Sequence, residues 1–227
     1  LNTSTVYQFS VIARNGSGTD AATSSLSNAS STLAVSAGTP TVNGNTITTL
    51  DVTLITNGNS ATTTYAIYNN TDSNYIAEDG TDNGSTPVFQ TSTEWGTGGV
   101  ITITGLTTNT PHQFSVIAKN RDNVEAATSS LSNNTYTLAV QAGAPTVNGA
   151  TTTTLDITID TNGNPATTTY AIYNSIAGAW INTDGSSTVT PTYQTTTEWG
   201  SGGTITATDL NTSTVYQFSV IARNGSG

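Results

Sequence analysis

Short runs of alternating apolar and polar residues recur along the whole chain. In the first run Tyr7, Phe9 and Val11 share one face, while Gln8 and Ser10 point to the other. Side chains alternate in this way along a β-strand, which has a period of two residues. The pattern therefore predicts a strand with one apolar and one polar face.

Further runs of the same kind follow, and Gly, Asn, Asp and Pro separate them. Leu50, Val52 and Leu54 form one inward set, and Ile101 and Ile103 form another. Apolar residues with helical spacing are missing throughout the sequence. Short alternating runs between turn residues are typical of all-β proteins, so the sequence predicts an all-β fold.

The sequence repeats itself at two distances. Residues 210–227 reproduce residues 1–18 without a change, and a looser copy of the same segment begins at Leu106. Identity thus returns after 209 residues and not after about 105. Repeats of this length indicate a tandem array, here one in which two unlike units alternate. We expect the 227 residues to be part of a longer array that begins and ends inside a unit.

The repeats predict three segments. Residues 1–36 form the C-terminal part of one domain, residues 37–141 a complete domain, and residues 142–227 the N-terminal part of a further domain. A unit of about 100 residues is long enough to bury its own core. Residues 37–40 and 142–145 are expected to be short linkers, each ending in a proline, that restrict the orientation of neighbours. About seven predicted strands in residues 37–141 indicate a two-sheet sandwich.

The segment that repeats most faithfully resembles the end of strand E and strand F of fibronectin type III domains. The residues that carry this resemblance are Leu1, Thr5, Tyr7, Phe9, Val11, Ala13 and Asn15, and again Leu210, Thr214, Tyr216, Phe218, Val220, Ala222 and Asn224. The resemblance implies a tandem array of immunoglobulin-like, fibronectin type III-like β-sandwiches. It is similar to repeats in large extracellular surface or filament proteins of bacteria or archaea. It further implies that the tyrosine closes a corner by hydrogen bonding to nearby backbone.

The sequence departs from the family in the position of its tryptophans. Leu54 and Ile159 stand where the family has a core tryptophan in the second strand. A recurrent Glu-Trp-Gly motif contains Trp95 and Trp199, and we expect these two to supply the core indole instead. If they were exposed, their rings could stack on sugars.

His112 is the one histidine of the chain and takes the place of the corner tyrosine, at which the sister repeats have Tyr7 and Tyr216. A Ser-His-Asp triad could be built only around His112. We therefore predict a structural role for these three residues and no catalytic centre. Nothing in the spacing of the acidic residues marks a carboxylate pair for glycoside hydrolysis.

The composition narrows the choice of partners. Only 8% of the residues are charged, against roughly 25% in ordinary domains, and the net charge is −10. With four Lys and Arg in total, nucleic acid and anionic membrane surfaces are unlikely partners by charge. The chain has no cysteine, hence no disulfide, and no run of 18 apolar residues to insert in a membrane.

Two kinds of candidate site remain. The acidic loop of residues 78–84 offers Asp79 and Asp82 as calcium ligands, although its spacing is not that of an EF-hand. A solvated turn is the alternative, and no cofactor is predicted. Candidate glycosylation sequons occur at Asn2, Asn15, Asn28, Asn69, Asn83, Asn133, Asn211 and Asn224.

These observations predict a non-catalytic extracellular or cell-surface protein, namely a repetitive β-sandwich filament, stalk or giant adhesin. Its expected partners are neighbouring repeats of the same chain or filament and cell-surface or extracellular polysaccharide. The alternative is a spacer or carbohydrate-binding accessory region of a secreted glycoside hydrolase. An 18-residue segment that recurs without change favours the structural array.

Overall fold

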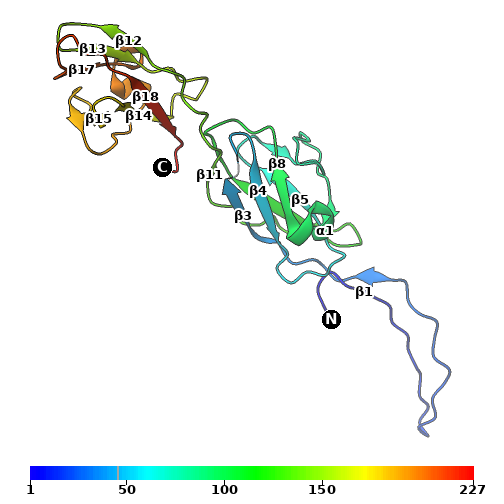
Figure 1. Cartoon of the computed structure of the whole chain (residues 1–227). Coiled ribbons are helices and arrows are strands. Elements are labelled where there is room, and N and C mark those ends of the chain that lie inside the picture. The colour runs from blue at the N-terminus through cyan, green and yellow to red at the C-terminus, as the bar shows by residue number, and fades with distance from the viewer. Residues whose placement is uncertain (45) are drawn as a thin grey trace. The chain divides into compact units, whose positions relative to one another are not determined.

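The computed structural model describes residues 1–44 and 46–227, which are almost entirely β-structure and connecting turns (Figure 1). The first half contains β1 (Val6–Tyr7), β2 (Ser30–Ser31), β3 (Gly38–Gly44), β4 (Leu50–Ile55), β5 (Thr64–Asn69), β6 (Asn74–Tyr75), β7 (Gln90–Thr91), β8 (Val100–Ile103), β9 (Pro111–His112) and β10 (Phe114–Lys119). The second half contains β11 (Thr135–Tyr136), β12 (Thr146–Gly149), β13 (Leu155–Thr158), β14 (Thr169–Asn174), β15 (Ala179–Ile181), β16 (Ser187–Thr188), β17 (Thr204–Ala207) and β18 (Phe218–Arg223).

The described chain separates into two compact units. The first unit comprises residues 1–43, 51–104 and 113–133, and the second comprises residues 44–50, 105–112 and 134–227. Each unit therefore includes the end of one predicted repeat together with part of the next. The domain boundaries that the sequence periodicity predicts, at residues 36/37 and 141/142, stay a prediction.

The larger sheets of the first unit are those of a two-sheet sandwich. One sheet has the strand order β3-β4-β8, and the other has the order β10-β5-β6 with β7 also paired to β5. In β4, Val52 and Leu54 are buried, and in β8 Ile101 and Ile103 are buried while the residues between them are more exposed. Both sheets thus bury one apolar face, as the alternation predicted.

The second unit repeats this arrangement. Its sheets have the orders β12-β13-β17 and β16-β15-β14-β18, and β9 pairs with β11 in a short two-stranded sheet. The core of this unit is formed by buried apolar side chains from both larger sheets and from the segment before β17: Ile157, Ile159, Tyr170, Ile172, Ile181, Trp199, Ala207, Leu210 and Val220. The predicted all-β fold with repeated sandwiches is confirmed.

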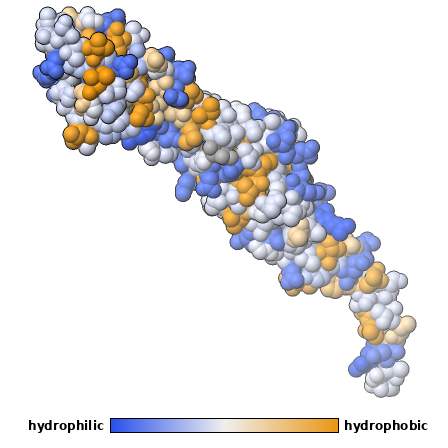
Figure 2. All heavy atoms as spheres, in the orientation of Figure 1, coloured by the Kyte–Doolittle hydropathy of each residue, from blue (hydrophilic) through white to orange (hydrophobic). Residues whose placement is uncertain are grey.

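Two short helices that the sequence reading missed precede the last strand of each three-stranded sheet. They are α1 (Ser92–Trp95) and α2 (Thr196–Trp199), followed by single 3₁₀ turns at Thr97–Gly99 and Ser201–Gly203. The part of the chain that is described has no helix long and apolar enough to cross a membrane. On the face seen in Figure 2, apolar residues lie in separate patches among polar ones.

Three local expectations were wrong. Residues 38–40 belong to strand β3 rather than to a linker. The strand predicted around residues 7–13 is reduced to β1, and Phe9 and Val11 are 59% and 70% exposed. The predicted strand near residues 31–35 shrinks to β2. Residues 37–141 contain nine strand segments among those described, because short pairings at the sheet edges are interrupted by turns.

Candidate functional site

The acidic loop forms a turn that uses its own carboxylates. Asp79 accepts hydrogen bonds at Oδ1 from the backbone N–H of Thr81 (3.0 Å) and from its hydroxyl (2.6 Å). Asp82 Oδ1 accepts one from the N–H of Gly84 (2.6 Å). The Thr81 hydroxyl, followed by its N–H, lowers the pKa of Asp79. Within residues 1–44 and 46–227, no group of three or more His, Asp or Glu side chains is placed to hold a metal ion.

The Glu-Trp-Gly motifs build the two short helices. Thr91 and Glu94 form a capping box: the carboxylate of Glu94 accepts hydrogen bonds from the N–H and the hydroxyl of Thr91, both at 2.8 Å. These bonds lower the pKa of Glu94, and Thr195 does the same for Glu198. Gly96 has a φ of 147°, and a side chain there would collide with the carbonyl oxygen of Val100.

The capped helices direct both tryptophans into the interior. Trp95 is 3% exposed and Trp199 is 2% exposed. Each indole Nε1 donates to a backbone carbonyl of the adjacent central strand, Trp95 to Tyr65 and Trp199 to Tyr170, at 2.8 Å in both cases. Neither ring therefore offers a face for a sugar.

The corner residues hold the chain just before the strand that follows. The hydroxyl of Tyr7 accepts a hydrogen bond from the N–H of Asn2 (2.7 Å), and that of Tyr216 accepts one from Asn211 (2.9 Å). This is the backbone contact that the fibronectin resemblance implied. His112 is fully buried in β9, where it lies opposite Thr135 of β11. Its position is that of a side chain inside the fold, away from solvent.

The sequons differ widely in accessibility. Asn2, Asn15, Asn28, Asn133 and Asn211 are exposed. Asn69 is 1% exposed and donates from Nδ2 to the Asp72 carboxylate at 2.7 Å, while Asn83 and Asn224 are half-buried. A glycan on Asn69 would require this part of the first unit to open.

The few basic side chains are used locally. Arg14 pairs with Asp20 at 2.6 Å, with both groups exposed, and this hydrogen bond lowers the pKa of Asp20. The ammonium of Lys119 lies 3.6 Å from the centre of the Phe89 ring. At the equivalent place in the second unit, Arg223 lies 3.9 Å from the Tyr193 ring. These cations pack on aromatic faces rather than forming a basic patch.

The most extensive repeated polar contacts join the end of one predicted repeat to a turn of the next. We refer to each such place as a junction: residues 30–36 meet residues 56–60 in the first unit, and residues 135–141 meet residues 161–165 in the second. Both partners of each contact lie within the same compact unit.

An Asn-Gly turn positions the key side chain at each junction. Asn57 and Gly58 have φ values of 53° and 77°, and Asn162 and Gly163 have 48° and 79°. Two consecutive residues with positive φ are typical of a type I′ turn, which favours Asn-Gly. The backbone N–H of the next residue closes the turn, as Asn59 does onto the carbonyl of Thr56 at 3.1 Å.

The residue after each turn forms what we call an asparagine clamp. Asn59 donates from Nδ2 to the carbonyl of Val35 (2.7 Å) and accepts at Oδ1 from the N–H of Val35 (2.8 Å). Asn164 makes the same two bonds with Val140, at 2.7 and 2.8 Å. A side-chain amide thus pairs with both backbone groups of one residue, which fixes the position and the direction of that strand end.

Further asparagines reinforce each clamp. Asn57 donates to the carbonyl of Ser36 and Asn162 to that of Gln141, both at 3.0 Å. From the other side, Asn120 donates to the carbonyl of Thr32 at 3.2 Å. Asn224 similarly donates to the carbonyl of Thr137 at 3.1 Å. The junctions are therefore the candidate functional site of this chain, and their function is mechanical rather than chemical.

Sequence reasoning identified the Asn-Gly turns but missed the clamps. The clamp residue is one amide among many in an Asn-rich chain, and its partner lies 24 residues upstream. One signal was present, because the Thr-Asn-Gly-Asn segment recurs unchanged at residues 56–59 and 161–164.

Fold and site together define a non-enzymatic class of protein architecture, an array of fibronectin type III-like β-sandwiches joined by short polar junctions. No family model and no curated protein sequence matches the chain.

Three solved structures of fibronectin type III arrays are similar to the chain. A two-domain segment of chicken tenascin has 10% identity and a TM-score of 0.46, covering 83% of this chain and 91% of that one. The FN1–FN3 domains of chicken CNTN1 have 14% identity and a TM-score of 0.33, with 98% and 71% covered. The central fibronectin array of RIM-binding protein has 15% identity and a TM-score of 0.30, with 83% and 58% covered.

Proposed function

We propose that the chain is part of an extracellular or cell-surface structural array, a stalk, filament or adhesin shaft that separates whatever lies at its two ends. The array acts as a spacer and carries out no catalysis. Its immediate partners are neighbouring repeats, and polysaccharide at the surface is the other partner class in keeping with an uncharged, Thr- and Asn-rich exterior.

The observation that carries this proposal is the recurrence of the asparagine clamp at both junctions. A spacer transmits length only if its joints resist bending. At each junction the clamp residue makes two hydrogen bonds to one backbone residue, and two further asparagines bind the same strand end. With a net contribution of about 1 kcal/mol per hydrogen bond, four such bonds add about 4 kcal/mol to each joint.

The alternative, a carbohydrate-binding region of a secreted hydrolase, needs an exposed aromatic platform. The recurrent tryptophans do not provide one, because Trp95 and Trp199 are buried and bonded to backbone carbonyls. A plain spacer in a hydrolase would use the same junctions, and it differs from the proposed array only in what the ends carry.

The clamp can be tested with the double variant Asn59→Ala, Asn164→Ala. Its local effect is read by hydrogen exchange at Val35 and Val140, whose N–H groups donate to the clamp oxygens. We expect both amides to exchange at least tenfold faster than in the wild type. Asn133→Ala is the matched control, since Asn133 is exposed and outside both junctions.

The spacer role itself is tested by small-angle X-ray scattering on the same proteins. The wild type and Asn133→Ala should give one narrow distribution of maximum dimension, and the double variant a broader one. If the wild type already shows a broad distribution, or if the double variant matches it while the two amides exchange faster, the joints do not set the length and the spacer role is wrong.

A further inference from the structure

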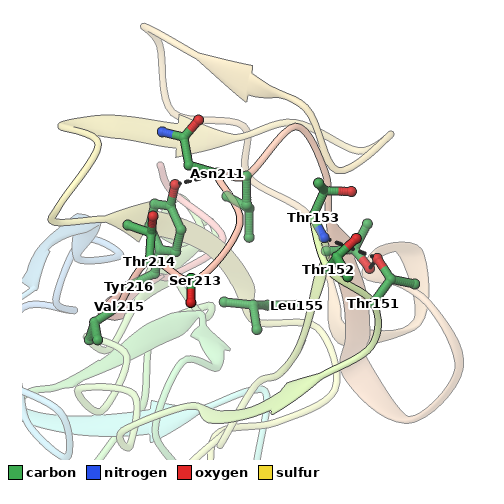
Figure 3. Close-up of a pocket in the computed structure, with 11 residues that line it drawn as sticks. Thr151, Thr152, Thr153, Leu155, Asn211, Ser213, Thr214, Val215 and Tyr216 are labelled. Atoms are coloured by element: carbon green, nitrogen blue, oxygen red, sulfur yellow. Dashed lines mark hydrogen bonds between the residues drawn. The ribbon is translucent and has the colours of Figure 1, made fainter.

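A groove of about 250 Å³ opens along one edge of the last repeat (Figure 3). It is lined by residues 151–155 on one side and by Leu210, Asn211 and residues 213–216 on the other. Val215 on its rim is 80% exposed, and Leu155 and Tyr216 are only half-buried. The groove therefore exposes backbone and apolar side chains that belong to the edge of a sandwich.

In the central repeat the same position is filled by a strand. Residues 46–50 and 106–112 correspond to the two walls of the groove, and residues 135–138 lie between them. Leu138 donates from its N–H to the carbonyl of Thr46 (2.9 Å) on one wall. On the other wall, Thr137 donates from its hydroxyl to the carbonyl of Thr107 (2.7 Å). Thr137 is fully buried there.

Residues 142–227 contain no counterpart of residues 135–138, but residues 30–33 do match that segment. Thr32 and Leu33 stand where the central repeat has Thr137 and Leu138. They already make the same bonds to the segment that precedes β1. Thr32 donates from its hydroxyl to the carbonyl of Asn2 (2.6 Å) and from its N–H to the carbonyl of Thr5 (3.0 Å). The N–H of Ser4 in turn donates to the carbonyl of Leu33 (3.0 Å).

We propose that residues 19–36 of one copy of this chain fill the groove of a second copy. Residues 1–18 and 210–227 are identical, so the strand would exchange one partner for another of the same sequence. Every hydrogen bond that Thr32 makes to residues 2–5 can be remade with residues 211–214. The assembly completes the last repeat of one chain and continues directly into the central repeat of the next.

The exchange adds interactions that the hairpin of residues 1–36 does not have. None of the bonds between residues 2–7 and 30–33 uses the N–H of Leu33, whereas its counterpart in Leu138 bonds to the other wall of the groove. Docked in the groove, Leu33 would donate to the carbonyl of Thr151, and Thr32 would become buried as Thr137 is. The extra backbone bond and the burial of the groove favour the exchanged form.

The occupant is a second copy because both the groove and the matching strand are present in this sequence, and the strand's present partner is duplicated at the groove. The same segment also exposes Phe9 and Val11, which have buried counterparts in Phe114 and Val116. The inference does not rest on the spacer role. Failure to assemble would leave the asparagine clamps and their test unaffected.

The experiment uses the full 227-residue chain, annealed just below its unfolding temperature at a series of concentrations, because strand exchange requires the hairpin to open. Size-exclusion chromatography with light scattering then gives the mass. We expect a ladder of dimers and longer head-to-tail species that grows with concentration. A synthetic peptide of residues 19–36, added in excess during annealing, should occupy the groove and leave monomers.

The diagnostic variant is Leu33→Pro, which removes only the N–H that the docked strand uses. We expect about tenfold weaker association, the value of one buried backbone hydrogen bond. Ala34→Pro, a proline one residue further on, is the matched control and should assemble like the wild type. Circular dichroism of both variants should show unchanged unfolding of the central repeat.

Three results would overturn the inference. The wild type could remain monomeric at every concentration with residues 211–216 unprotected in hydrogen exchange, which would mean that the groove stays open. It could remain monomeric with those residues protected, which would mean that the chain closes on itself. Finally, Leu33→Pro could assemble as well as Ala34→Pro, and the docking geometry would then be wrong.

Discussion

Replacing Trp199 with phenylalanine tests whether the Glu-Trp-Gly motif acts through the core. The indole Nε1 donates to the carbonyl of Tyr170 at 2.8 Å, and the same carbonyl also accepts from the N–H of Gln194 at 3.1 Å. The carbonyl therefore keeps one partner in the variant. Losing the second bond costs about 0.5–1.5 kcal/mol, without the larger cost of an unsatisfied buried group.

The smaller ring adds a packing loss. Truncating a buried tryptophan completely costs about 3–5 kcal/mol, so the partial loss in Trp199→Phe is about 1–2 kcal/mol. We expect a total of about 2–3 kcal/mol, measured in the second unit by guanidinium unfolding followed by circular dichroism. The unfolding midpoint on heating should fall by roughly 10 °C.

Trp180→Phe is the control in the same unit. Trp180 is half-buried and packs against Tyr173, with ring centres 4.9 Å apart, and phenylalanine keeps that aromatic pair. Its cost should stay below about 1 kcal/mol. If Trp199→Phe lost less than Trp180→Phe, the indole would not be a core element and the sugar-stacking alternative would regain support.

Two further predictions concern charge and metal. Hydrogen bonds from the N-cap threonines lower the pKa of Glu94 and Glu198, so their contribution to stability is complete above the ordinary glutamate pKa and is lost as the pH falls through the lowered value; in acid titrations followed by circular dichroism, Glu94→Gln, Glu198→Gln should be less stable at neutral pH and lose less stability in that acid range. Asp79 and Asp82 already cap their own turn, so exchanging EDTA for calcium chloride should leave the melting temperature unchanged, and a calcium-dependent rise would establish them as ligands.

The sequence pattern predicted the strands of the sandwiches well where both faces of a run differ. Leu50, Val52 and Leu54 are buried in β4 as the alternation indicated. The same alternation was misleading for Phe9 and Val11, which are exposed. Period-two alternation shows which residues share a face, but it contains no information on whether another layer covers that face.

The short helices and the junctions were out of reach for different reasons. A four-residue helix such as α1 is too short to show a 3.6-residue period, and the Thr-x-x-Glu capping box at Thr91 was its one local signal. The clamp of Asn59 depends on a strand end that folding brings to it from residue 35. Local sequence determines the turn that aims the amide, whereas the partner is a property of the tertiary structure.

The two junctions share their clamps but differ in one reciprocal detail. In the first, the hydroxyl of Ser60 donates to the carbonyl of Ser4 at 2.9 Å. The second has Pro165 in place of Ser60 and thus no hydroxyl, and it has Asn109 in place of Ser4.

Asn109 compensates by reaching further, since its Nδ2 donates to the Thr168 hydroxyl at 2.6 Å and its Oδ1 accepts from the N–H of Gly225 at 3.0 Å. A small residue therefore goes with a hydroxyl donor, and a long amide goes with a proline. Each repeat carries one half of two different pairs, so two adjacent repeats of the same kind would mismatch at their junction. This physical constraint explains why Ser213 restores the residue of Ser4 and why identity returns after two repeats rather than one.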